Sequence, residues 1–161
     1  VVMGHPDYEV DSGKVTLSGI DLLDLEPWER ARSGVFLSFQ YPQSVPGLQV
    51  GNFLRKSVSS ILGDEFAKGS EFRDKLRSSI EELGIPRSFL SRYVNDGFSG
   101  GEKKRFEILQ LMLLKPKLAI CLNITLETPN CLIYPFGLPV ILHLLCILTG
   151  EAFFGNFCNP S

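Results

Sequence analysis

The charged residues are confined to the first part of the chain, and this limits what each part can fold into. All 16 lysines and arginines, and every aspartate, lie in residues 1–120, whereas residues 121–161 contain only Glu127 and Glu151 as charged residues. All four cysteines lie in the second part. Since a folded domain keeps most of its charged side chains on its surface, no single globular surface explains this change, and the two parts are interpreted separately.

The composition as a whole is that of a globular protein. Of the 161 residues, 44% are hydrophobic and 21% are charged, which is typical of a folded chain and not of a disordered one. The length suits a single domain. The formal net charge of −2 shows no basic surplus, so we expect no nucleic-acid partner. Residues 1–6 lack the charged and apolar segments of a secretory leader, so none is predicted.

The N-terminal residues predict a strand followed by a helix. Residues 15–20 alternate between apolar and polar and end in a Ser-Gly turn signal, so they predict one strand of a hairpin, after a turn at residues 11–14. Pro27 suits the first position of a helix, and Gly34 suits its C-terminal stop. We expect Trp28, in this helix, to lie in the core.

A second strand and two longer helices are predicted next. Residues 35–39, VFLSF, predict a short buried strand with Phe39 in the core, and we expect a loop over residues 40–47. Apolar residues recur every three or four positions in residues 48–62 and 70–84, which predicts two helices. Strands and helices thus follow one another in the manner of an α/β fold.

The clearest helix start in the sequence is at Ser99. Serine is a preferred N-cap residue, and Glu102 three positions later completes a capping-box pattern. We expect this helix to end before Pro116, and the apolar run at residues 118–122 then predicts a strand in the middle of a parallel sheet. A further short element is expected at residues 87–94.

Several motifs, taken together and in order, resemble one branch of the ABC-type ATPases. The segment FSGGEKKR resembles the signature loop of that superfamily, although Phe98 and Glu102 depart from the common LSGGQ form. Over residues 1–120 the chain resembles the ATPase subunit of the SUF iron–sulfur cluster assembly system, the SufC-like proteins. The motifs that carry this resemblance are GHPDYEV (4–10), ERARSGVFLSFQYP (29–42), VPG (45–47), FLR (53–55) and YVNDGFSGGEKKRFEILQ (93–110).

The resemblance implies an α/β fold, namely part of a P-loop NTPase domain of the ABC type with a helical subdomain inserted. It assigns residues 1–47 to the ATP-binding core, 48–95 to the helical subdomain, and 96–120 to the signature helix and the strand at the Walker B position. Residues 121–161 are an apolar tail that does not resemble the family. The resemblance also implies that Val1 lies partway along a helix of the family, truncated so that the first strands are missing.

The same resemblance implies a nucleotide-binding role for Gln40, Ser99, Gly100, Gly101 and Glu102, with ATP and Mg²⁺ as ligands. In ABC ATPases the signature serine and glycines of one subunit approach the γ-phosphate bound by the opposite subunit. Glycines let backbone amides approach an anion, the helix start adds its positive dipole end, and a serine hydroxyl donates a hydrogen bond. The alternatives are a capped helix start without a ligand and, at Gln40, a loop residue without a role.

The parts that catalyse hydrolysis in this family have no match in the sequence. No G-x-x-x-x-G-K-[ST] motif occurs, so the phosphate-cradling loop and its lysine are missing from the 161 residues. Where the family has Asp-Glu, this chain has Leu122 and Asn123, which supply neither an Mg²⁺ ligand nor a general base. We therefore predict no catalytic residue here and no hydrolysis of ATP by the chain alone.

The departure after residue 120 begins within one motif and continues along the tail, which indicates a frameshift, a retained intron or an alternative exon. Residues 131–148 are uncharged and reach the short limit of a membrane span, but Pro135 and Pro139 interrupt them, so we expect no span. The four cysteines lack C-x-x-C spacing, so no metal or cluster site is predicted.

The predicted function is that of the ATP-binding subunit of the SUF machinery, as an incomplete chain. The SUF scaffold subunits and, on ATP binding, a second ATPase subunit are the implied partners. One alternative is a non-catalytic fragment that binds the scaffold through the helical insert and the loop at Gln40. Others are an ATP-binding subunit of an ABC transporter and the product of a disrupted gene. A cytoplasmic location is implied, with the plastid stroma as the alternative.

Overall fold

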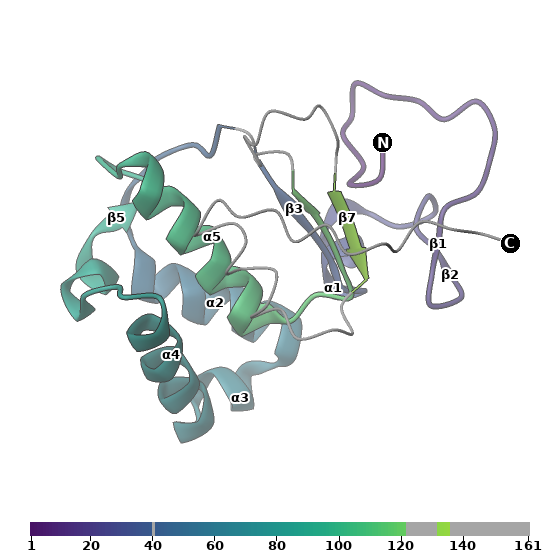
Figure 1. Ribbon diagram of the computed structural model, residues 1–161. Helices are drawn as coiled ribbons and strands as arrows, with labels where there is room; N and C mark the ends of the chain where they lie inside the picture. Colours follow the sequence, from purple (N-terminus) through teal and green to yellow (C-terminus); the bar gives the residue numbers. More distant parts are fainter. Residues whose placement is uncertain (40, 122–131, 136–161) are drawn as a thin grey trace, which may run out of the picture.

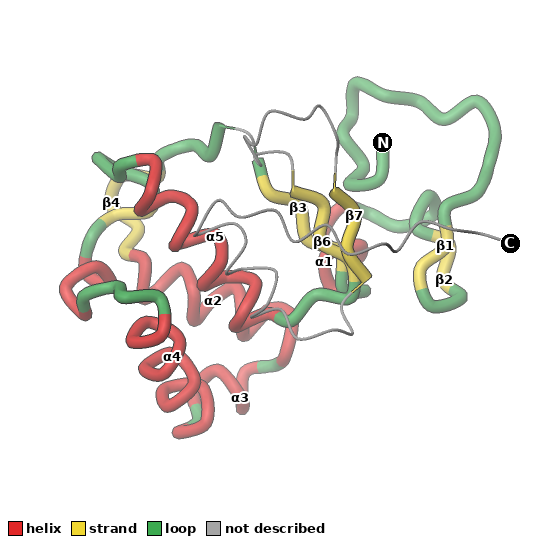
Figure 2. The backbone as a smooth tube through the Cα atoms, in the orientation of Figure 1, coloured by secondary structure: helices red, strands yellow, loops and turns green. Residues whose placement is uncertain are grey.

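The computed structural model describes residues 1–39, 41–121 and 132–135 (Figures 1 and 2). The described part combines helices with small sheets and has an α/β fold. Its elements, in chain order, are β1 (Thr16–Leu17), β2 (Ile20–Asp21), α1 (Pro27–Arg32), β3 (Val35–Ser38), β4 (Val45–Gln49), α2 (Val50–Leu62), α3 (Asp64–Lys68), α4 (Ser70–Glu82), the 3₁₀ helix η1 (Arg87–Ser91), β5 (Tyr93–Val94), α5 (Gly100–Leu114), β6 (Leu118–Cys121) and β7 (Leu132–Pro135).

A three-stranded sheet lies at the centre of the view in Figure 1, with its strands in the order β3-β6-β7. β3 and β6 run parallel, and their register ends with Ser38 opposite Cys121. This confirms the strands predicted at residues 35–39 and 118–122, each to within one residue, and the parallel pairing of the second. On the other side of β6, the strand β7 pairs antiparallel, and the sequence did not predict this strand.

The pairing of β3 with β6 begins at Gly34. This glycine has a φ of 103°, and a Cβ added to it would lie 2.9 Å from the side chain of Lys117. Its carbonyl oxygen accepts hydrogen bonds from the backbone N–H groups of Lys117 (2.8 Å) and Leu118 (3.0 Å). Gly34 therefore ends α1, as predicted, and also brings β6 alongside β3, because only glycine adopts this conformation without strain.

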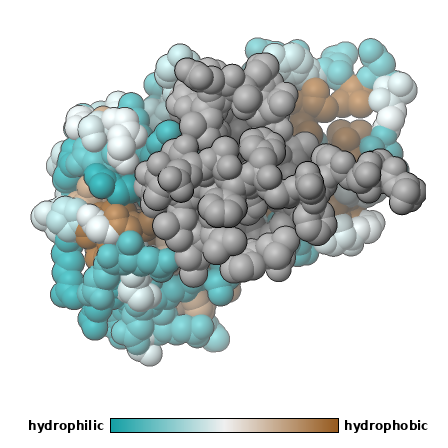
Figure 3. Space-filling view, in the orientation of Figure 1, coloured by the Kyte–Doolittle hydropathy of each residue, from teal (hydrophilic) through white to brown (hydrophobic). Residues whose placement is uncertain are grey.

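The helices α2, α4 and α5 pack around one hydrophobic core, to the left of the sheet in Figure 1. α2 contributes Leu54 and Val58 to this core, α4 contributes Phe72 and Ile80, and α5 contributes Leu109. In Figure 3 the lower left face, where α3 and α4 lie, is mostly teal, so polar side chains separate this part of the core from solvent. The helices thus bury one apolar face each and expose the other.

The two long helices predicted from periodicity are confirmed. α2 and α4 lie within the predicted ranges 48–62 and 70–84. α5 begins after the cap residue Ser99 and ends before Pro116, as predicted. The sequence did not predict α3, because five residues between two glycines are too few to show a helical period.

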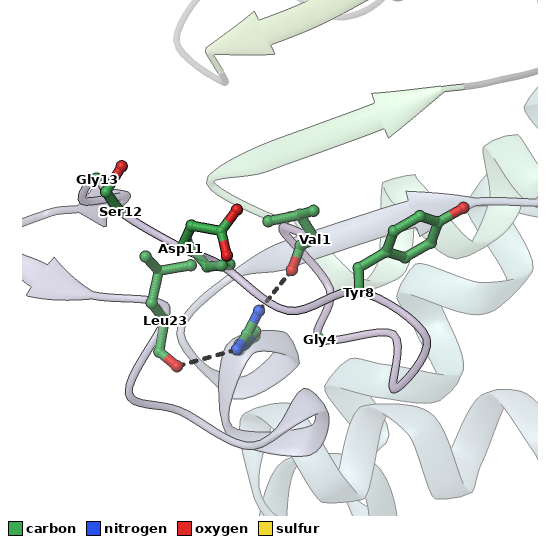
Figure 4. Close-up of a pocket in the computed structure, with 9 residues that line it drawn as sticks. Val1, Gly4, Tyr8, Asp11, Ser12, Gly13 and Leu23 are labelled. Atoms are coloured by element: carbon green, nitrogen blue, oxygen red, sulfur yellow. Dashed lines mark hydrogen bonds between the residues drawn. The ribbon is translucent and has the colours of Figure 1, made fainter.

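A buried arginine holds the N-terminal segment against α1. The side chain of Arg30 is 6% exposed and donates hydrogen bonds to the backbone carbonyl oxygens of Val1 (2.8 Å), Val2 (3.0 Å), Leu23 (3.2 Å) and Leu25 (2.7 Å). Figure 4 draws the bonds to Val1 and Leu23 as dashed lines. These carbonyl groups compensate for the cost of burying a guanidinium group.

Two of the N-terminal predictions are wrong in their bounds. Residues 16–21 form the β1–β2 hairpin, so residues 15–20 are not one strand. The predicted Ser-Gly turn is present: Ser18 and Gly19 both have positive φ (52° and 83°) and make a two-residue turn between β1 and β2. The predicted loop over residues 40–47 ends earlier, because β4 begins at Val45 and pairs antiparallel with β5. A local turn decides the first case, and a pairing between residues far apart in the sequence decides the second.

Two aromatic residues that were expected in the core are exposed. Trp28 is 57% exposed and Phe39 is 63% exposed. α1 buries Arg30 in place of Trp28, and the guanidinium of Arg32 lies 5.0 Å from the centre of the Trp28 ring on the outer face. Side chains two positions apart lie on different faces of a helix, so the face with Trp28 points towards solvent when the face with Arg30 is buried.

Leu109 and Leu62 offer a matched test of the helical core. Leu109→Ala is expected to lower the free energy of unfolding by about 2–5 kcal/mol, because Leu109 is 0% exposed and its loss leaves a cavity. Leu62→Ala, at a side chain that is 44% exposed, is expected to cost less than about 1 kcal/mol. Urea unfolding followed by far-ultraviolet circular dichroism measures the free energy of unfolding of both variants. Equal losses of stability in the two variants would contradict the burial of Leu109 in this core.

Candidate functional site

The predicted residues Ser99, Gly100, Gly101 and Glu102 lie together at the N-terminus of α5. Phe98, immediately before them, is buried and anchors the chain in the hydrophobic core, whereas Ser99 and the two glycines are exposed. We call residues 97–102 the signature loop. The loop therefore has a fixed attachment on one side and presents its backbone to solvent on the other.

The turn before the signature loop is joined to the segment that follows residue 40. Asn95 and Gly97 both have positive φ (57° and 62°), which lets the chain reverse direction after β5. The side-chain amide of Asn95 donates a hydrogen bond to the backbone carbonyl of Gln43 (2.9 Å). β4 and β5 pair beside this contact. The signature loop and the segment after Gln40 thus share one supporting structure.

A complete capping box fixes the start of α5. The hydroxyl oxygen of Ser99 accepts a hydrogen bond from the backbone N–H of Glu102 (3.2 Å), and the backbone N–H of Ser99 donates to Oε2 of Glu102 (2.8 Å). In the first bond the hydroxyl acts as an acceptor, so its own hydrogen remains available to a ligand. The predicted capping box is therefore confirmed, and it leaves Ser99 able to donate.

The amides of Gly100 and Gly101 are the other donors of the loop. The first N–H groups of a helix have no partner within the helix, and these two donate no hydrogen bond within the described residues. A Cβ added at either glycine would meet no atom within 4 Å, so the space beside both amides is open. An anion can therefore approach both N–H groups at the positive end of the α5 dipole.

The carboxylate of Glu102 stabilises the conformation of the signature loop. Its Oε2 accepts the Ser99 N–H, and its Oε1 forms an ion pair with Nη1 of Arg92 (2.5 Å). The backbone hydrogen bond from Ser99, followed by the bond from Arg92, holds the pKa of Glu102 below its usual value. The carboxylate therefore stays charged while both its oxygens are engaged inside the protein. The sequence did not single out Arg92, because its partners come together only in the folded chain.

Positive charge follows directly after the loop. Lys104 is exposed, and Lys103 and Arg105 are half-buried, all in the first turns of α5. Together with the helix dipole, these residues favour an anion over a cation near the loop. In the part of the chain that the structure describes, no group of three His, Cys, Asp or Glu residues is placed to hold a metal ion.

Three of the positions discussed from the sequence lie outside the described residues. Gln40, which was predicted to bind nucleotide, lies outside the described residues, as do Leu122 and Asn123. The neighbours of Gln40 in the chain, Phe39 and Tyr41, are 63% and 79% exposed. Phe39 directly follows the end of β3.

A second contact, which the sequence did not suggest, joins α5 to β3. The hydroxyl of Ser38, which is 1% exposed, donates a hydrogen bond to Oε1 of Glu107. Burial raises the pKa of Glu107, although the bond from Ser38 opposes this effect. Glu107 is the charged residue in the mainly apolar second half of α5, and this is the sign of the contact in the sequence. The bond fixes α5 beside the strand that leads to Gln40.

An apolar groove of about 650 Å³ lies between the sheet side and the helical side of the molecule. α1 and β3 line one wall, and α2 and α5 line the other. Trp28, one of the exposed aromatic residues, stands at this groove. The apolar residues that line it are Trp28, Ala31, Phe36, Leu48, Phe53, Ile61 and Leu114.

The α/β fold and the capped, glycine-containing helix start agree with an ATP-binding domain of the ABC type, and the comparison with known families establishes that class. The chain belongs to the ABC transporter family, because the family model of that description matches residues 3–122. The match ends where the charged part of the sequence ends. In the described residues no helix is both long and apolar enough to cross a membrane.

Curated relatives from several organisms match the same part of the chain. The "Probable ABC transporter ATP-binding protein" of Streptococcus pyogenes serotype M18 is 46% identical over 120 residues, which are 74% of this chain and 47% of the relative. "Vegetative protein 296" of Bacillus subtilis is 46% identical over 121 residues, 74% of this chain and 46% of the relative. A "Probable ATP-dependent transporter" of Synechocystis is 45% identical over 123 residues, 74% and 48% of the two chains. The chain thus spans about half the length of these relatives.

The lowered pKa of Glu102 predicts how acid affects the loop. Since the pKa of Glu102 in the folded state lies below the usual value of 4.5, the Glu102 contacts stabilise the fold above that pH, and this contribution is lost as the pH falls through the folded-state pKa. The stability difference between the wild type and Glu102→Gln should therefore shrink on acidification. Urea unfolding over a pH series measures it. Glu65→Gln, at an exposed position of α3, is the control, and a difference that grows with acid would contradict the assignment.

Proposed function

We propose that this chain contributes the signature half of an ATP site. In this proposal the signature loop binds the γ-phosphate of an ATP molecule held by the P-loop of a second ATP-binding subunit. The observation that carries it is the exposed start of α5, where the Ser99 hydroxyl and the amides of Gly100 and Gly101 are available donors. An anion bound there gains hydrogen bonds from preorganised groups and the favourable end of the helix dipole.

The other predicted residues take indirect or separate roles in this proposal. Glu102 orients Ser99 and does not touch the phosphate, because both its oxygens are engaged and its charge would repel an anion. Gln40 is proposed as the residue that senses the nucleotide, through its Mg²⁺ or the attacking water. Mg²⁺ would neutralise charge on the phosphates, and the second subunit would hold it together with the ATP.

The motifs in residues 1–120 support a more specific function, in the SUF iron–sulfur cluster assembly machinery. GHPDYEV and FQYP are narrower than the general ABC pattern and favour this branch. Under this proposal the SUF scaffold subunits and a second ATPase subunit are the partners, residues 48–95 are a helical subdomain, and the location is the cytoplasm or a plastid stroma. The rival is an ATP-binding subunit of a membrane transporter, which the names of the relatives favour.

The apolar groove favours a second candidate function, that of a non-catalytic fragment that binds a scaffold subunit. Trp28, Phe36 and Phe53 give the groove a mainly apolar lining, and Trp28 is 57% exposed. Exposed apolar surface of this kind marks contact sites on soluble proteins. This function requires no ATP. A pull-down with purified scaffold subunits tests this function. If the Trp28→Ala variant binds the scaffold as well as the wild type does, the groove is not the binding site.

The purified chain is expected to show no ATP turnover by itself. The 161 residues contain no P-loop motif, and the family's Asp-Glu positions hold Leu122 and Asn123. Phosphate release measured with saturating MgATP checks this, with a mock purification as the control for contaminating ATPases. Turnover above that control would refute the expectation.

A mixed-subunit assay tests the signature half directly. The second subunit is the Streptococcus pyogenes relative named as an ATP-binding protein, with the residue aligned with Ser99 replaced by arginine to disable its own signature loop. Adding this chain should restore ATP turnover, because the loop then completes the partner's site. Absence of any restored turnover would count against the proposed function.

Two substitutions at Ser99 separate binding from stability. Ser99→Ala removes the cap and the donor, and should lower the free energy of unfolding by about 1 kcal/mol and abolish the restored turnover. Ser99→Asp keeps a good N-cap but puts a carboxylate where the phosphate would bind, so it should keep the stability and lose the turnover. Turnover retained by Ser99→Asp would contradict a phosphate at this position.

A further inference from the structure

The side chain of Arg92 connects the two ends of the signature loop. Its Nη1 forms the ion pair with Oε1 of Glu102, inside α5, and its Nη2 donates to the carbonyl oxygen of Gly97 (3.0 Å), where the loop begins. Between these contacts, the guanidinium lies 4.6 Å from the centre of the Phe98 ring and 5.5 Å from that of Phe89. One side chain thus contacts the loop at its start, at its anchor and at its end.

Arg92 is itself held by the helical side of the molecule. Its backbone carbonyl accepts a hydrogen bond from the N–H of Val50, the first residue of α2 (2.9 Å), and its own N–H donates to the carbonyl of Phe89 (3.1 Å). The Phe98 ring packs against those of Phe89 (4.6 Å between centroids) and Phe106 (6.0 Å). The position of the guanidinium is therefore set by α2, η1 and α5 together.

The chemistry of these contacts requires arginine. A guanidinium is planar, so it stacks on an aromatic ring while its edge donates to two acceptors, whereas a lysine ammonium can do one or the other. The bond to Glu102 is charge-assisted, which makes it stronger than a neutral hydrogen bond. Since Glu102 neutralises Arg92, and the Arg92 side chain is only 38% exposed, the guanidinium is not a free cation for a phosphate.

We infer that Arg92 is the positioning residue of the signature loop: it holds Ser99, Gly100 and Gly101 in the orientation that meets the γ-phosphate. It does so through Glu102, without touching the nucleotide. This inference rests on the function proposed above for the loop. Without Arg92, the Glu102 carboxylate loses one of its two partners, and the bond that orients the Ser99 amide is free to open. The donors remain present but no longer point in one direction.

Arg92→Lys tests this inference in the mixed-subunit assay. We expect kcat of the restored turnover to fall about tenfold, because catalysis depends steeply on the placement of the groups around the transition state. KM for ATP should change by less than about twofold, because the second subunit makes most of the ground-state contacts with ATP. Arg87→Lys is the matched control, since Arg87 pairs with Glu81 at the exposed surface (3.3 Å) and should leave both values unchanged. A wild-type kcat for Arg92→Lys would overturn the inference.

Hydrogen exchange provides a readout that does not depend on turnover. In the wild-type chain the Ser99 amide donates to Glu102, so it should exchange slowly for an exposed residue. Arg92→Lys should speed its exchange about tenfold, while the amide of Leu109 in the core keeps its wild-type rate. Equal exchange of the Ser99 amide in the two proteins would overturn the inference.

The two readouts also distinguish the failure of this inference from the failure of the proposed function. If the wild-type chain restores no turnover but Arg92→Lys speeds the Ser99 exchange, the loop is braced by Arg92 and the proposed role in ATP binding is wrong. If the wild-type chain restores turnover and Arg92→Lys matches it in kcat and in exchange, the proposed role stands and the positioning role of Arg92 is wrong.

Discussion

The packing of α5 against α2 and α4 is the interaction on which the candidate site depends. Leu109 and Leu113, in the second half of α5, are 0% and 1% exposed. At the same end, Nζ of Lys75 in α4 donates to the carbonyl of Leu113 (3.1 Å) and satisfies one of the unpaired carbonyl groups of the helix terminus. Apolar and polar residues are thus separated along the length of α5. One end is fixed in the core, and the other presents backbone amides to solvent.

Two contacts link α5 and the turn before it to residues on either side of position 40. Ser38 at the end of β3 donates to Glu107 in α5, and Asn95 before the signature loop donates to the Gln43 carbonyl. One contact lies before position 40 in the sequence and the other after it. Ser38 is bonded to α5 itself, and Gln43 is bonded to the turn before the signature loop. These two bonds are the contacts through which the role proposed for Gln40 would reach the signature loop.

Much of this arrangement could be predicted from the sequence, because its determinants are local. The cap at Ser99 and the stop at Gly34 depend on residues a few positions apart, and α2, α4, β3 and β6 follow from apolar periodicity or from short apolar runs. The burial of Arg30 and the exposure of Trp28 could not be predicted, because the carbonyl groups that Arg30 contacts come from segments that only the folded chain brings together.

The bracing of the signature loop by Arg92 escaped prediction for the same reason. Its partners at positions 97, 98 and 102 are near in the sequence, but the contacts depend on η1 and on the packing of Phe89. The resemblance to a known family identified the loop, and elementary helix chemistry explained its cap. Neither could identify the side chain that fixes its direction, because that is a property of the three-dimensional arrangement.

The continuity of α5 has a mechanical consequence. The helix has 15 residues without interruption, so it is about 22 Å long and stiff. It runs from the signature loop to the turn that leads into β6, so a rotation of this stiff helix around its C-terminal end moves the signature loop. A tilt of about 5° around its C-terminal end displaces Ser99 by about 2 Å, which is enough to make or break a hydrogen bond to a phosphate. A small rotation at one end of α5 thus becomes a displacement at the signature loop that is large on the scale of a hydrogen bond.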